Sequence, residues 1–569
     1  MKGSFRSGIA VSIFITVLVI VVASFRGSGV GQESDSLCRA IERRLTTADG
    51  SPPVVQGERL RTDPEVLRCF YASRLFQPLW TVSGQTLPEA PILIAALSRA
   101  GEEGLYPEGY LRVSRDFRQD LDAFRQRGEE IPEALLADLE LLLTDAFVSF
   151  GYELSFGRVN TEKVCDGDCL CRRQECLLGS LEAALDGGGL ADLLRDLSPR
   201  NPSYGKLREM LARYRQVADR GGWPTVAVDG NPNSGSRNAD VPALRERLRL
   251  SGDLTGEMPV SDGMLFDDGI TAGLRRFQGR QGLKPSGTLN PETLRLLNRP
   301  VEDEIRLIEL NLERWRWLPQ DLGLRYVMIN IPDYSLALVE NQRTVMTMRT
   351  VIGRRLWNTP SFSARMKYLE INPVWNIPPS ILEQEIIPTI LRDPGYITKK
   401  NIRFYGGSGK GLREVLPDEI DWSRVRPQAF PYQVVQEAGP ANPLGRVKFI
   451  FPNEEGVYLH DTPSKHLFGR EKRTFSHGCI RIEKPLALAA YILQQDQQWS
   501  WKKLMAEVNR GKTKQIVLRE PVNVHIVYFT AWIDDEGVMQ TRPDVYHSDL
   551  ILDLALRKRA SPIAEPPLD

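Results

Sequence analysis

The run from His460 to Arg481 constrains this chain more than any other stretch of its sequence. It holds three of the five histidines, and its cysteine, Cys479, directly follows a His-Gly pair. A thiol becomes a strong nucleophile only as thiolate, and a histidine two residues away across a flexible glycine can keep it in that form. We therefore predict Cys479 as a nucleophile and His477 as its base. The alternative is a buried structural thiol beside a surface histidine.

Short segments of β-strand character surround this run. Alternating or short apolar stretches occur at residues 325–331, 335–341, 344–353, 448–451, 457–460 and 479–482. His460 therefore ends one strand, and Cys479 begins another. Strands of this length and spacing predict a compact β-sandwich whose loops gather a site at one edge.

A long insertion interrupts these strands after residue 388. About sixty residues rich in glycine, proline and charge separate that point from Leu444, and a loop this long in a compact domain is usually functional or mobile. Trp375 and Asn376 lie just before it.

The chain before the strands is mainly helical. Apolar residues recur at three- and four-residue spacings from Asp63 to Val159, as in packed helices. A stretch rich in Gly, Asn, Ser and Pro follows Trp223, and three short helices come next. The third has Asn290 as its N-cap and Pro291 at its first position. The residues that these three helices are expected to bury are Val241, Leu244, Leu248, Ile270, Leu274, Phe277, Leu294 and Leu297.

The N-terminal residues predict export. Lys2 and Arg6 precede an uncharged run, rich in Ile and Val, from Gly8 to Phe25. As a helix this run would span about 27 Å, slightly less than the apolar core of a bilayer. We expect an uncleaved signal anchor in residues 1–30, and cleavage after a weak Val-Val-Ala site is the alternative. In both cases the remaining chain is exported.

Seven cysteines in an exported chain predict disulfides, and an odd number leaves one thiol over. Cys479 is the residue expected to stay free. The six that would form three bridges are Cys38, Cys69, Cys165, Cys169, Cys171 and Cys176. Four of these lie in CDGDCLCRRQEC, which we interpret as a stapled loop. Zinc binding is a weaker alternative, because the segment lacks paired C-x2-C spacings.

The charge balance limits the possible partners. The chain has 73 basic and 73 acidic residues, which argues against nucleic acid or another polyanion as its main partner.

The run from His460 to Arg481 resembles the signature of the L,D-transpeptidases with a YkuD-type catalytic domain. In that signature a histidine is followed, after a bounded gap, by Ser/Thr-His-Gly-Cys, a hydrophobic residue and Arg or Asn. The matching residues here are His460, Ser476, His477, Gly478, Cys479, Ile480 and Arg481. Two further segments, FYASRLFQPLW from Phe70 and GLYP from Gly104, resemble the scaffold domain of the large Gram-negative members.

The segment from Ile270 to Asn298 resembles the peptidoglycan-binding domain of many wall enzymes, although a helical spacer would satisfy its periodicity equally well. The resemblance implies a multidomain α+β chain: a β-sandwich catalytic domain with a lid insertion, a helical scaffold region and a small three-helix peptidoglycan-binding domain. The expected boundaries are 31–223 for the scaffold, 224–300 for the binding domain, 301–530 for the catalytic domain with its insertion at about 382–443, and 531–569 for a C-terminal segment.

The resemblance also implies an acyl transfer on peptidoglycan. Cys479 would attack a tetrapeptide stem after its third residue, a diamino acid, and release the terminal D-alanine. A side-chain amine of a second stem would then take the acyl group and form a 3-3 crosslink. Backbone N–H groups of the turn at residues 477–479 would steady the oxyanion. Neither a metal nor an organic cofactor is implied, and carbapenems are expected to acylate the thiol.

The expected site residues fall into two groups. The catalytic residues are Cys479, His477 and Gly478. The residues expected to bind substrate or shape the site are His460, Ser476, Arg481, Tyr458, Trp375 and Asn376. For Arg481, orientation of a substrate carboxylate and a structural salt bridge both remain open.

The expected location is the periplasm, with the chain anchored to the inner membrane by its N-terminal segment. The expected partners are peptidoglycan stems as donor and acceptor, and wall polymer held by residues 241–298. An L,D-carboxypeptidase of the same fold and a non-catalytic wall-binding protein remain alternatives. The intact motif argues against the second.

Overall fold

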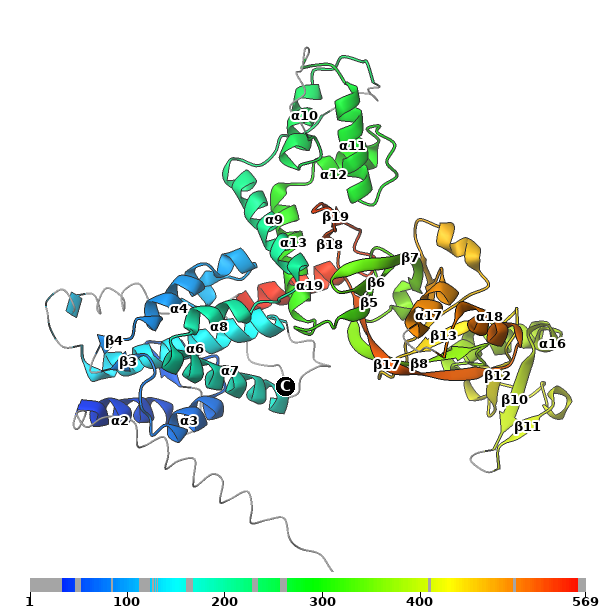
Figure 1. The fold of residues 1–569 in the computed structure, drawn as a ribbon, viewed down its shortest axis with the longest axis horizontal. Coiled ribbons are helices and arrows are strands. Elements are labelled where there is room, and N and C mark those ends of the chain that lie inside the picture. Colours follow the sequence, from blue (N-terminus) through cyan, green and yellow to red (C-terminus); the bar gives the residue numbers. More distant parts are fainter. Residues whose placement is uncertain are drawn as a thin grey trace, which may run out of the picture. The chain divides into compact units, whose positions relative to one another are not determined.

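The computed structural model describes residues 33–46, 53–82, 85–111, 131–159, 167–227, 234–255, 263–407, 411–494 and 498–560, with isolated positions between 123 and 129. The chain divides into two compact units (Figure 1): residues 1–101 with 105–198, and residues 102–104 with 199–569. The predicted signal anchor lies outside the described residues. Within the described ranges, no helix is long and apolar enough to cross a membrane.

The first unit is the predicted helical region. Its central helix, α6 (Glu133–Phe156), is buried on all sides from Leu136 to Val148. The buried Glu140 of α6 accepts hydrogen bonds from the backbone N–H groups of Leu79 and Trp80, and burial raises the pKa of Glu140 to about 7. The elements around α6 are α2 (Glu33–Leu45), α3 (Pro64–Ser73), α4 (Glu89–Ser98), α7 (Gly167–Gly187), α8 (Leu190–Asp196) and the hairpins β1 (Val54–Val55) with β2 (Glu58–Arg59) and β3 (Thr81–Val82) with β4 (Gln85–Thr86).

The prediction of a disulfide-stapled loop in this unit is wrong. The cysteine-rich segment is helical from Gly167 onward, as α7, and Cys69 on α3 and Cys176 on α7 are exposed free thiols. With these two thiols unpaired, the structure holds at most two bridges among the six cysteines. A helix also turns about 140° between Cys171 and Cys176, so the two side chains leave it in different directions. Cys165 and the side chain of Cys169 lie outside the described residues.

The second unit begins with two long helices and the predicted three-helix bundle. Helix α9 (Pro202–Asp219) packs against α13 (Val301–Arg316). Between them in sequence, α10 (Val241–Leu250), α11 (Asp268–Arg280) and α12 (Pro291–Leu297) form the bundle. Its core contains every residue expected there, with Leu294 only half-buried.

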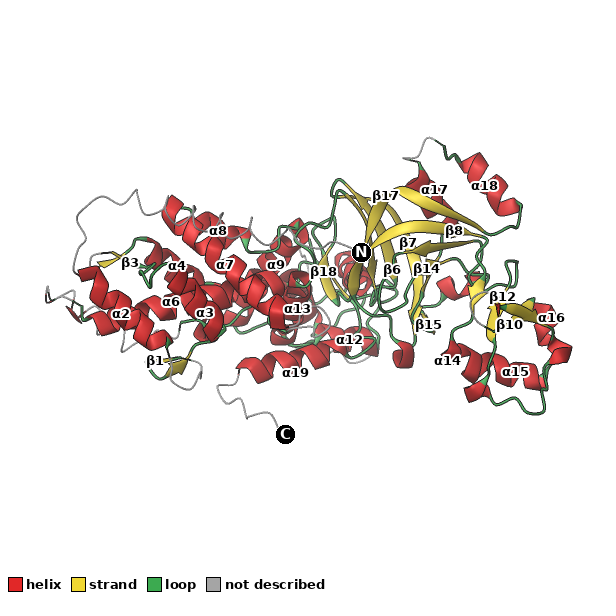
Figure 2. Cartoon of the chain, turned by 90° about the horizontal axis from the view of Figure 1, so that it is seen from below, coloured by secondary structure: helices red, strands yellow, loops and turns green. Residues whose placement is uncertain are grey.

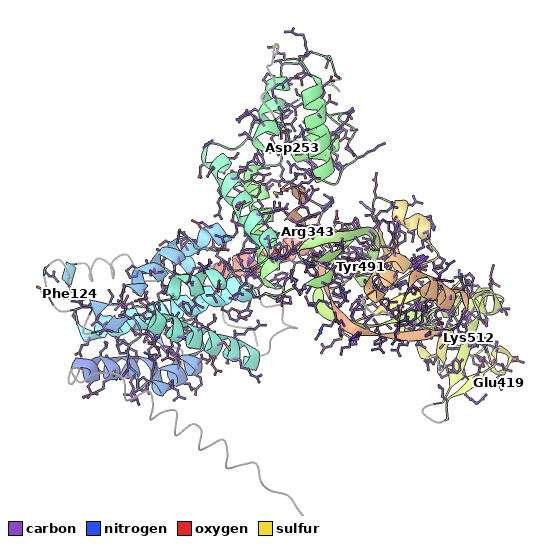
Figure 3. The ribbon with its side chains drawn as sticks, viewed as in Figure 1. Phe124, Asp253, Arg343, Glu419, Tyr491 and Lys512 are labelled. Atoms are coloured by element: carbon purple, nitrogen blue, oxygen red, sulfur yellow. The ribbon has the colours of Figure 1, made fainter. Side chains whose placement is uncertain are left out.

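Two polar devices fix this bundle. The side chain of Asn290 accepts the N–H of Thr293 at 2.8 Å and caps α12, as predicted. The buried Arg280 donates two hydrogen bonds to Asp253, at 2.6 and 2.7 Å, which ties α11 to the loop after α10. Figure 3 places Asp253 among these helices.

A nine-stranded sheet forms the largest part of the second unit. Its strands, in spatial order, are β15 (Thr474–Ser476), β7 (Arg343–Gly353), β16 (Ile480–Ile482), β14 (Leu459–His460), β13 (Val447–Ile450), β8 (Phe362–Ile371), β17 (Lys514–Val527), β5 (Arg325–Asn330) and β6 (Ser335–Glu340). Each of the six strand segments read from the sequence is present, with ends that differ by a few residues.

The sheet closes on itself because β7, the second strand of this order, also pairs with β6, the last one. Its first part pairs with β6, and its end pairs with β16 and β15. The two layers expected of a sandwich are therefore parts of one continuous curved sheet (Figure 2). Its buried core includes Val327, Leu369, Phe449 and Ile480. Helices α17 (Pro485–Leu493) and α18 (Trp501–Asn509) pack against this core.

The insertion folds as a subdomain with its own core. It has a four-stranded antiparallel sheet, in the order β11 (Arg413–Val415), β10 (Ile402–Gly406), β12 (Gln433–Gln436) and β9 (Trp375–Asn376). Before β10 come α14 (Pro379–Ile381), a π-helical turn (Leu382–Ile386), α15 (Ile387–Arg392) and α16 (Tyr396–Lys400). Ile387 and Phe404 are fully buried in this core. Figure 3 labels Glu419, which follows β11.

The chain ends with β18 (Ala531–Ile533), β19 (Met539–Thr541) and α19 (Ser548–Ala560). These elements join the second unit together. Thr541 of β19 donates a hydrogen bond to Gln281, directly after α11, and Arg542 donates one to the carbonyl of Arg280 at 3.0 Å. Arg542 also pairs with Asp333 beside the large sheet at 2.6 Å. The three-helix bundle is therefore fixed to the large sheet by polar contacts.

Candidate functional site

Two short parallel strands bring Tyr458 and Cys479 together. In the register of β14 and β16, Leu459 lies opposite Ile480 and His460 opposite Arg481. The N–H of Ile480 donates to the carbonyl of Tyr458 at 3.1 Å. Cys479 therefore directly precedes β16, and Tyr458 directly precedes β14. The sequence prediction that His460 ends one strand and that Cys479 begins another is confirmed within one residue.

The Ser476-Cys479 turn is held by its own residues. Gly478 has a φ of 110°, a conformation that favours glycine over any residue with a side chain. The hydroxyl of Ser476 donates to the carbonyl of Cys479 at 2.5 Å and accepts the N–H of Gly478 at 3.2 Å. Ser476 is thus a structural support of the turn, and the N–H of Gly478 already has a partner.

The Cys479 thiol is partly buried, beside a tyrosine and two cationic side chains. Burial raises its pKa, while hydrogen bonding from the backbone and hydroxyl of Tyr458 and the charges of Lys448 and Arg481 lower it. The sulfur also lies 3.9 Å from the carbonyl oxygen of Gly456. Because burial dominates, the resting group is a thiol, and its reaction requires a base or a charge brought by substrate.

Tyr458 links the thiol to the insertion and to Lys448. Burial raises the pKa of Tyr458 well above its usual value, so its hydroxyl stays protonated. The side chain of Trp375 hydrogen-bonds to it. The ammonium of Lys448 lies 3.9 Å from the centre of the Tyr458 ring, a cation–π contact. Trp375 is therefore part of the insertion core and also contacts the tyrosine that hydrogen-bonds to the thiol.

His477 contacts a carboxylate and a guanidinium. Its Nε2 lies 2.9 Å from Oε1 of Glu385, on the π-helical turn of the insertion, and 2.5 Å from Nη2 of Arg354. Its ring lies 4.8 Å from that of Trp357, centre to centre. Within the described residues, the side chain of His477 thus contacts Glu385, Arg354 and Trp357. The predicted contact with the Cys479 thiol is not one of these.

His460 is buried and its tautomer is fixed. Its Nδ1 lies 2.6 Å from the carbonyl oxygen of Asp461, which can only accept, so Nδ1 carries the proton. Burial, with the nearby charge of Arg481, lowers the pKa of His460 to about 3. Its ring lies 5.7 Å from that of Tyr458, on the same side of the strand. The backbone of Pro443 also hydrogen-bonds to the ring.

Arg481 lies opposite His460 and has donors to spare. Burial, and then the charge of Arg354, lower the pKa of Arg481, while the Cys479 and Glu385 charges raise it. Among the described residues, the buried Nε atoms of both Arg481 and Arg354 have no hydrogen-bond partner. The last predicted residue, Asn376, is exposed, and its side chain accepts a hydrogen bond from Gln433 at 3.1 Å.

Sequence reasoning missed Glu385, Arg354, Trp357 and Lys448. Arg354 and Trp357 follow β7, whose end pairs with β15 directly before the reactive turn. Glu385 reaches the site only because the insertion folds back over it. No local sequence pattern predicts that these residues contact the site. A charged residue in a polar loop does not by itself indicate a functional role.

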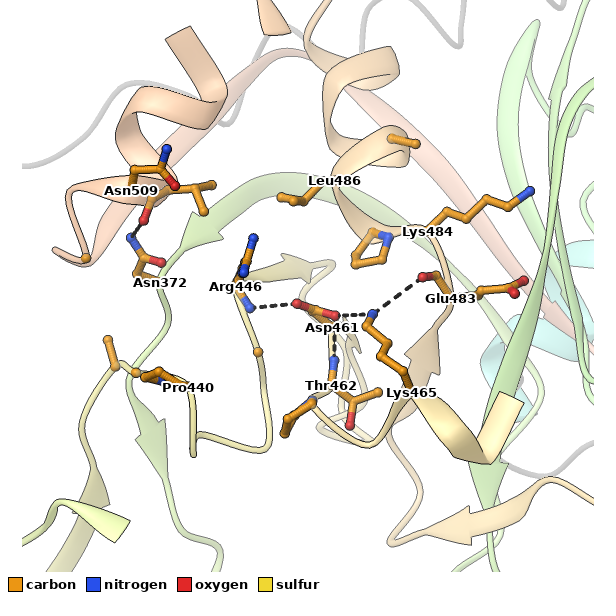
Figure 4. Close-up of a pocket in the computed structure, with 18 residues that line it drawn as sticks. Asn372, Pro440, Arg446, Asp461, Thr462, Lys465, Glu483, Lys484, Leu486 and Asn509 are labelled. Atoms are coloured by element: carbon orange, nitrogen blue, oxygen red, sulfur yellow. Dashed lines mark hydrogen bonds and ion pairs between the residues drawn. The ribbon is translucent and has the colours of Figure 1, made fainter. Parts of the chain in front are cut away.

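A separate cavity of about 760 Å³ lies beyond the carboxyl ends of β14 and β16. Asp461 occupies its floor, where it accepts the N–H of Arg446 at 2.9 Å and pairs with Lys465 at 2.6 Å (Figure 4). Its wall includes Leu486 and Val508. Its lining includes none of the predicted site residues. This cavity is therefore distinct from the surroundings of the Cys479 thiol.

Family comparisons identify three parts of the chain. The model for the L,D-transpeptidase catalytic domain matches residues 324–518, that for the scaffold domain matches residues 65–211, and the "Putative peptidoglycan binding domain" model matches residues 237–297. A curated Haemophilus influenzae protein named "Putative L,D-transpeptidase" is 32% identical over 248 residues, which cover 44% of this chain and 49% of the relative. The chain therefore spans about half the length of this relative.

Solved structures with similarity to the chain include L,D-transpeptidases. One from Mycobacterium smegmatis is 12% identical, with a TM-score of 0.18, and the match covers 35% of this chain and 58% of that one. One from Stackebrandtia nassauensis is 15% identical, with a TM-score of 0.20, and the match covers 53% and 96%. TM-scores this low support no structural argument. The sequence matches do show that the chain contains an L,D-transpeptidase catalytic domain and a peptidoglycan-binding domain.

Proposed function

We propose that this chain, which contains an L,D-transpeptidase catalytic domain, forms 3-3 crosslinks in peptidoglycan through a thioester on Cys479. The observation that carries the proposal is the placement of this thiol. It lies within the matched domain, on a glycine turn, between a protonated tyrosine hydroxyl and two cations. These surroundings offset part of the effect of burial on the pKa of the thiol, and they favour a developing oxyanion.

The reaction proceeds in two balanced steps. The Cys479 sulfur bonds to the carbonyl carbon of the third stem residue, the amide bond to the fourth residue breaks, and the thiol proton passes to the leaving amine by way of the base. The side-chain amine of a second stem then attacks the thioester, the carbon–sulfur bond breaks, and the thiol is restored. The products are free D-alanine and a crosslinked dimer.

We assign the base to His460, whose ring lies 5.7 Å from that of Tyr458, the residue that hydrogen-bonds to the thiol. The Asp461 carbonyl accepts a hydrogen bond from Nδ1, and a base oriented by such a bond is the usual arrangement beside a nucleophile. His477, the base predicted from the sequence, has its Nε2 engaged by Glu385 and Arg354.

Tyr458 is the donor best placed to steady the oxyanion. Its hydroxyl stays protonated and approaches the thiol. The N–H of Gly478, a donor expected from the sequence, is already bound by Ser476. The oxyanion site therefore draws on Tyr458 in addition to the backbone of the turn.

The proposal also covers the location of the protein in the cell and its binding to wall polymer. The peptidoglycan-binding domain, residues 241–298, supports a role as a tether that raises the local concentration of wall substrate. The apolar run at residues 8–25 supports export and retention at the inner membrane, with the catalytic domain in the periplasm.

Product analysis tests the reaction. The full chain is incubated with purified disaccharide-tetrapeptide, and the products are separated and weighed by mass spectrometry. A 3-3 dimer with loss of one D-alanine per crosslink is the expected result. Tripeptide alone would show that water replaces the acceptor amine, as in an L,D-carboxypeptidase, and unchanged substrate would contradict both activities.

A further inference from the structure

We propose that Arg354 and Arg481 bind the free terminal carboxylate of the donor stem, and that Glu385 of the insertion occupies this arginine site when no donor is bound. The inference rests on the proposed function, because it needs a stem-peptide donor at Cys479. It adds the feature of the donor that the site recognises, and it assigns a role to a residue outside the family signature.

Glu385 already behaves as a ligand of this site. Its Oε1 lies 3.1 Å from Nη2 of Arg354 and 2.9 Å from Nε2 of His477. It also raises the pKa of Arg481, which shows that its charge acts on the second arginine. The carboxylate thus lies against the donors that surround the reactive turn, although it comes from a different subdomain.

The two guanidinium groups have unused capacity for an anion. Their buried Nε atoms have no hydrogen-bond partner among the described residues. Each charge also acts against the other, since Arg354 lowers the pKa of Arg481. A carboxylate with two oxygens can satisfy planar guanidinium donors and neutralise this repulsion. Glu385 supplies one such group, and its contact with Arg354 uses a single nitrogen, Nη2.

The contact with Glu385 is weak enough to be exchanged. The side chains of Glu385 and Arg354 are 46% and 40% exposed. An ion pair this exposed contributes at most a small stabilisation. Glu385 also belongs to a subdomain with its own core, so it can withdraw while the large sheet stays intact. Its π-helical turn is a kind of irregularity that is frequent at functional sites.

The position of Arg481 fits a terminal carboxylate. Arg481 is two residues after Cys479, so their Cα atoms are about 7 Å apart along an extended chain. In a tetrapeptide donor, the carboxylate of the departing fourth residue lies about one residue length, roughly 3.5 Å, beyond the attacked carbonyl. The long arginine side chain covers the difference. A stem with a fifth residue, or with an amidated end, would place no charge there.

Other charged groups near the site do not compete for this role. Lys448 lies over the Tyr458 ring and interacts with Glu370. Tyr396 of the insertion faces Glu385, whose charge, after burial, raises the pKa of that tyrosine. Glu385 is therefore the carboxylate of the described residues that contacts both Arg354 and His477.

Binding to an inactive protein tests the inference apart from the chemistry. The full chain with Cys479→Ala is titrated calorimetrically with a tetrapeptide stem as free acid and with the same stem as C-terminal amide. We expect the amide to bind at least about tenfold more weakly. In this background Glu385→Gln should tighten binding of the acid about two- to fivefold, the factor that corresponds to an exposed ion pair. It should leave binding of the amide unchanged.

Matched variants serve as controls. Arg354→Gln should remove most of the discrimination between acid and amide, whereas Arg355→Gln and Glu383→Gln, each a close sequence neighbour, should leave it intact. Thermal unfolding of each variant confirms that it is folded. Equal binding of acid and amide, or weaker binding of the acid after Glu385→Gln, would overturn the inference. Discrimination in binding without any thioester in the parent enzyme would instead contradict the proposed function alone.

Discussion

Nε2 of His477 lies 2.9 Å from Oε1 of Glu385, a residue 92 positions earlier in the chain that the insertion carries to the reactive turn. Arg354 contacts the same ring nitrogen. One nitrogen cannot donate to a carboxylate and accept from a guanidinium at once. The protonated ring is therefore stabilised by Glu385, and the ring with a free Nε2 lone pair is stabilised by Arg354.

This relationship predicts opposite shifts for two variants. Burial lowers the pKa of His477, Glu385 raises it and Arg354 lowers it. Glu385→Gln removes the group that favours the proton, so the pKa should fall further. Arg354→Gln removes the group that opposes it, so the pKa should rise. Titration of the His477 ring by NMR measures both, and shifts of the same sign would contradict the arrangement.

Substitution of the two histidines separates their roles. General-base removal typically costs a factor of about 10² to 10⁴ in rate. We expect His460→Asn to lower the acylation rate constant in this range and His477→Asn to lower it less than about tenfold, since His477 acts on the loop and on Glu385. Single-turnover acylation by a stem peptide measures both rates. A larger loss of rate in His477→Asn than in His460→Asn would indicate that His477 is the base.

The cysteines give a prediction that departs from the disulfide pattern expected of the sequence. Cys69 and Cys176 are exposed free thiols, and Cys479 is a free thiol in a partly buried pocket. Alkylation without reductant should therefore label at least these three residues. Cys479 should react more slowly at neutral pH, because burial raises its pKa. A single labelled thiol per chain would contradict the structure and support three bridges.

The buried pair of Arg280 and Asp253 tests the tether. Asp253→Asn leaves Arg280 buried without its counter-ion, a change that typically costs about 3 to 5 kcal/mol and should unfold or loosen the three-helix bundle. Retention on purified sacculi should fall, while acylation of Cys479 by a small carbapenem should persist. Asp268→Asn is the control on the same bundle. Equal loss of both activities would show that the bundle supports the catalytic sheet structurally.

The sequence predicts the strands and the reactive turn because their signals are local. Alternation specified β5, β6 and β7, and the Gly478 turn follows from the residue type. The N-terminal cap of α12 could be predicted equally well, because Asn290 and Pro291 act within one helical turn. In each case the residues that determine the structure are neighbours in the chain.

The partners of the site were not predictable in the same way. The contact of Glu385 with His477 depends on how a long insertion folds back, and closure of the sheet depends on β7 pairing on two sides. The prediction of a disulfide-stapled loop was wrong because the cysteine spacing suits a loop, whereas the segment from Gly167 is helical. Tertiary contacts decided each of these features, and no local pattern reports them.

Intact-protein mass spectrometry of the full chain mixed with a tetrapeptide stem tests the central claim most directly. The account predicts a transient mass increase equal to the stem minus D-alanine, located by peptide mapping on Cys479. Cys479→Ala should abolish this adduct, whereas Cys69→Ala, which removes a free thiol in the other unit, should not. Release of D-alanine or formation of dimer by the Cys479→Ala protein would contradict the account.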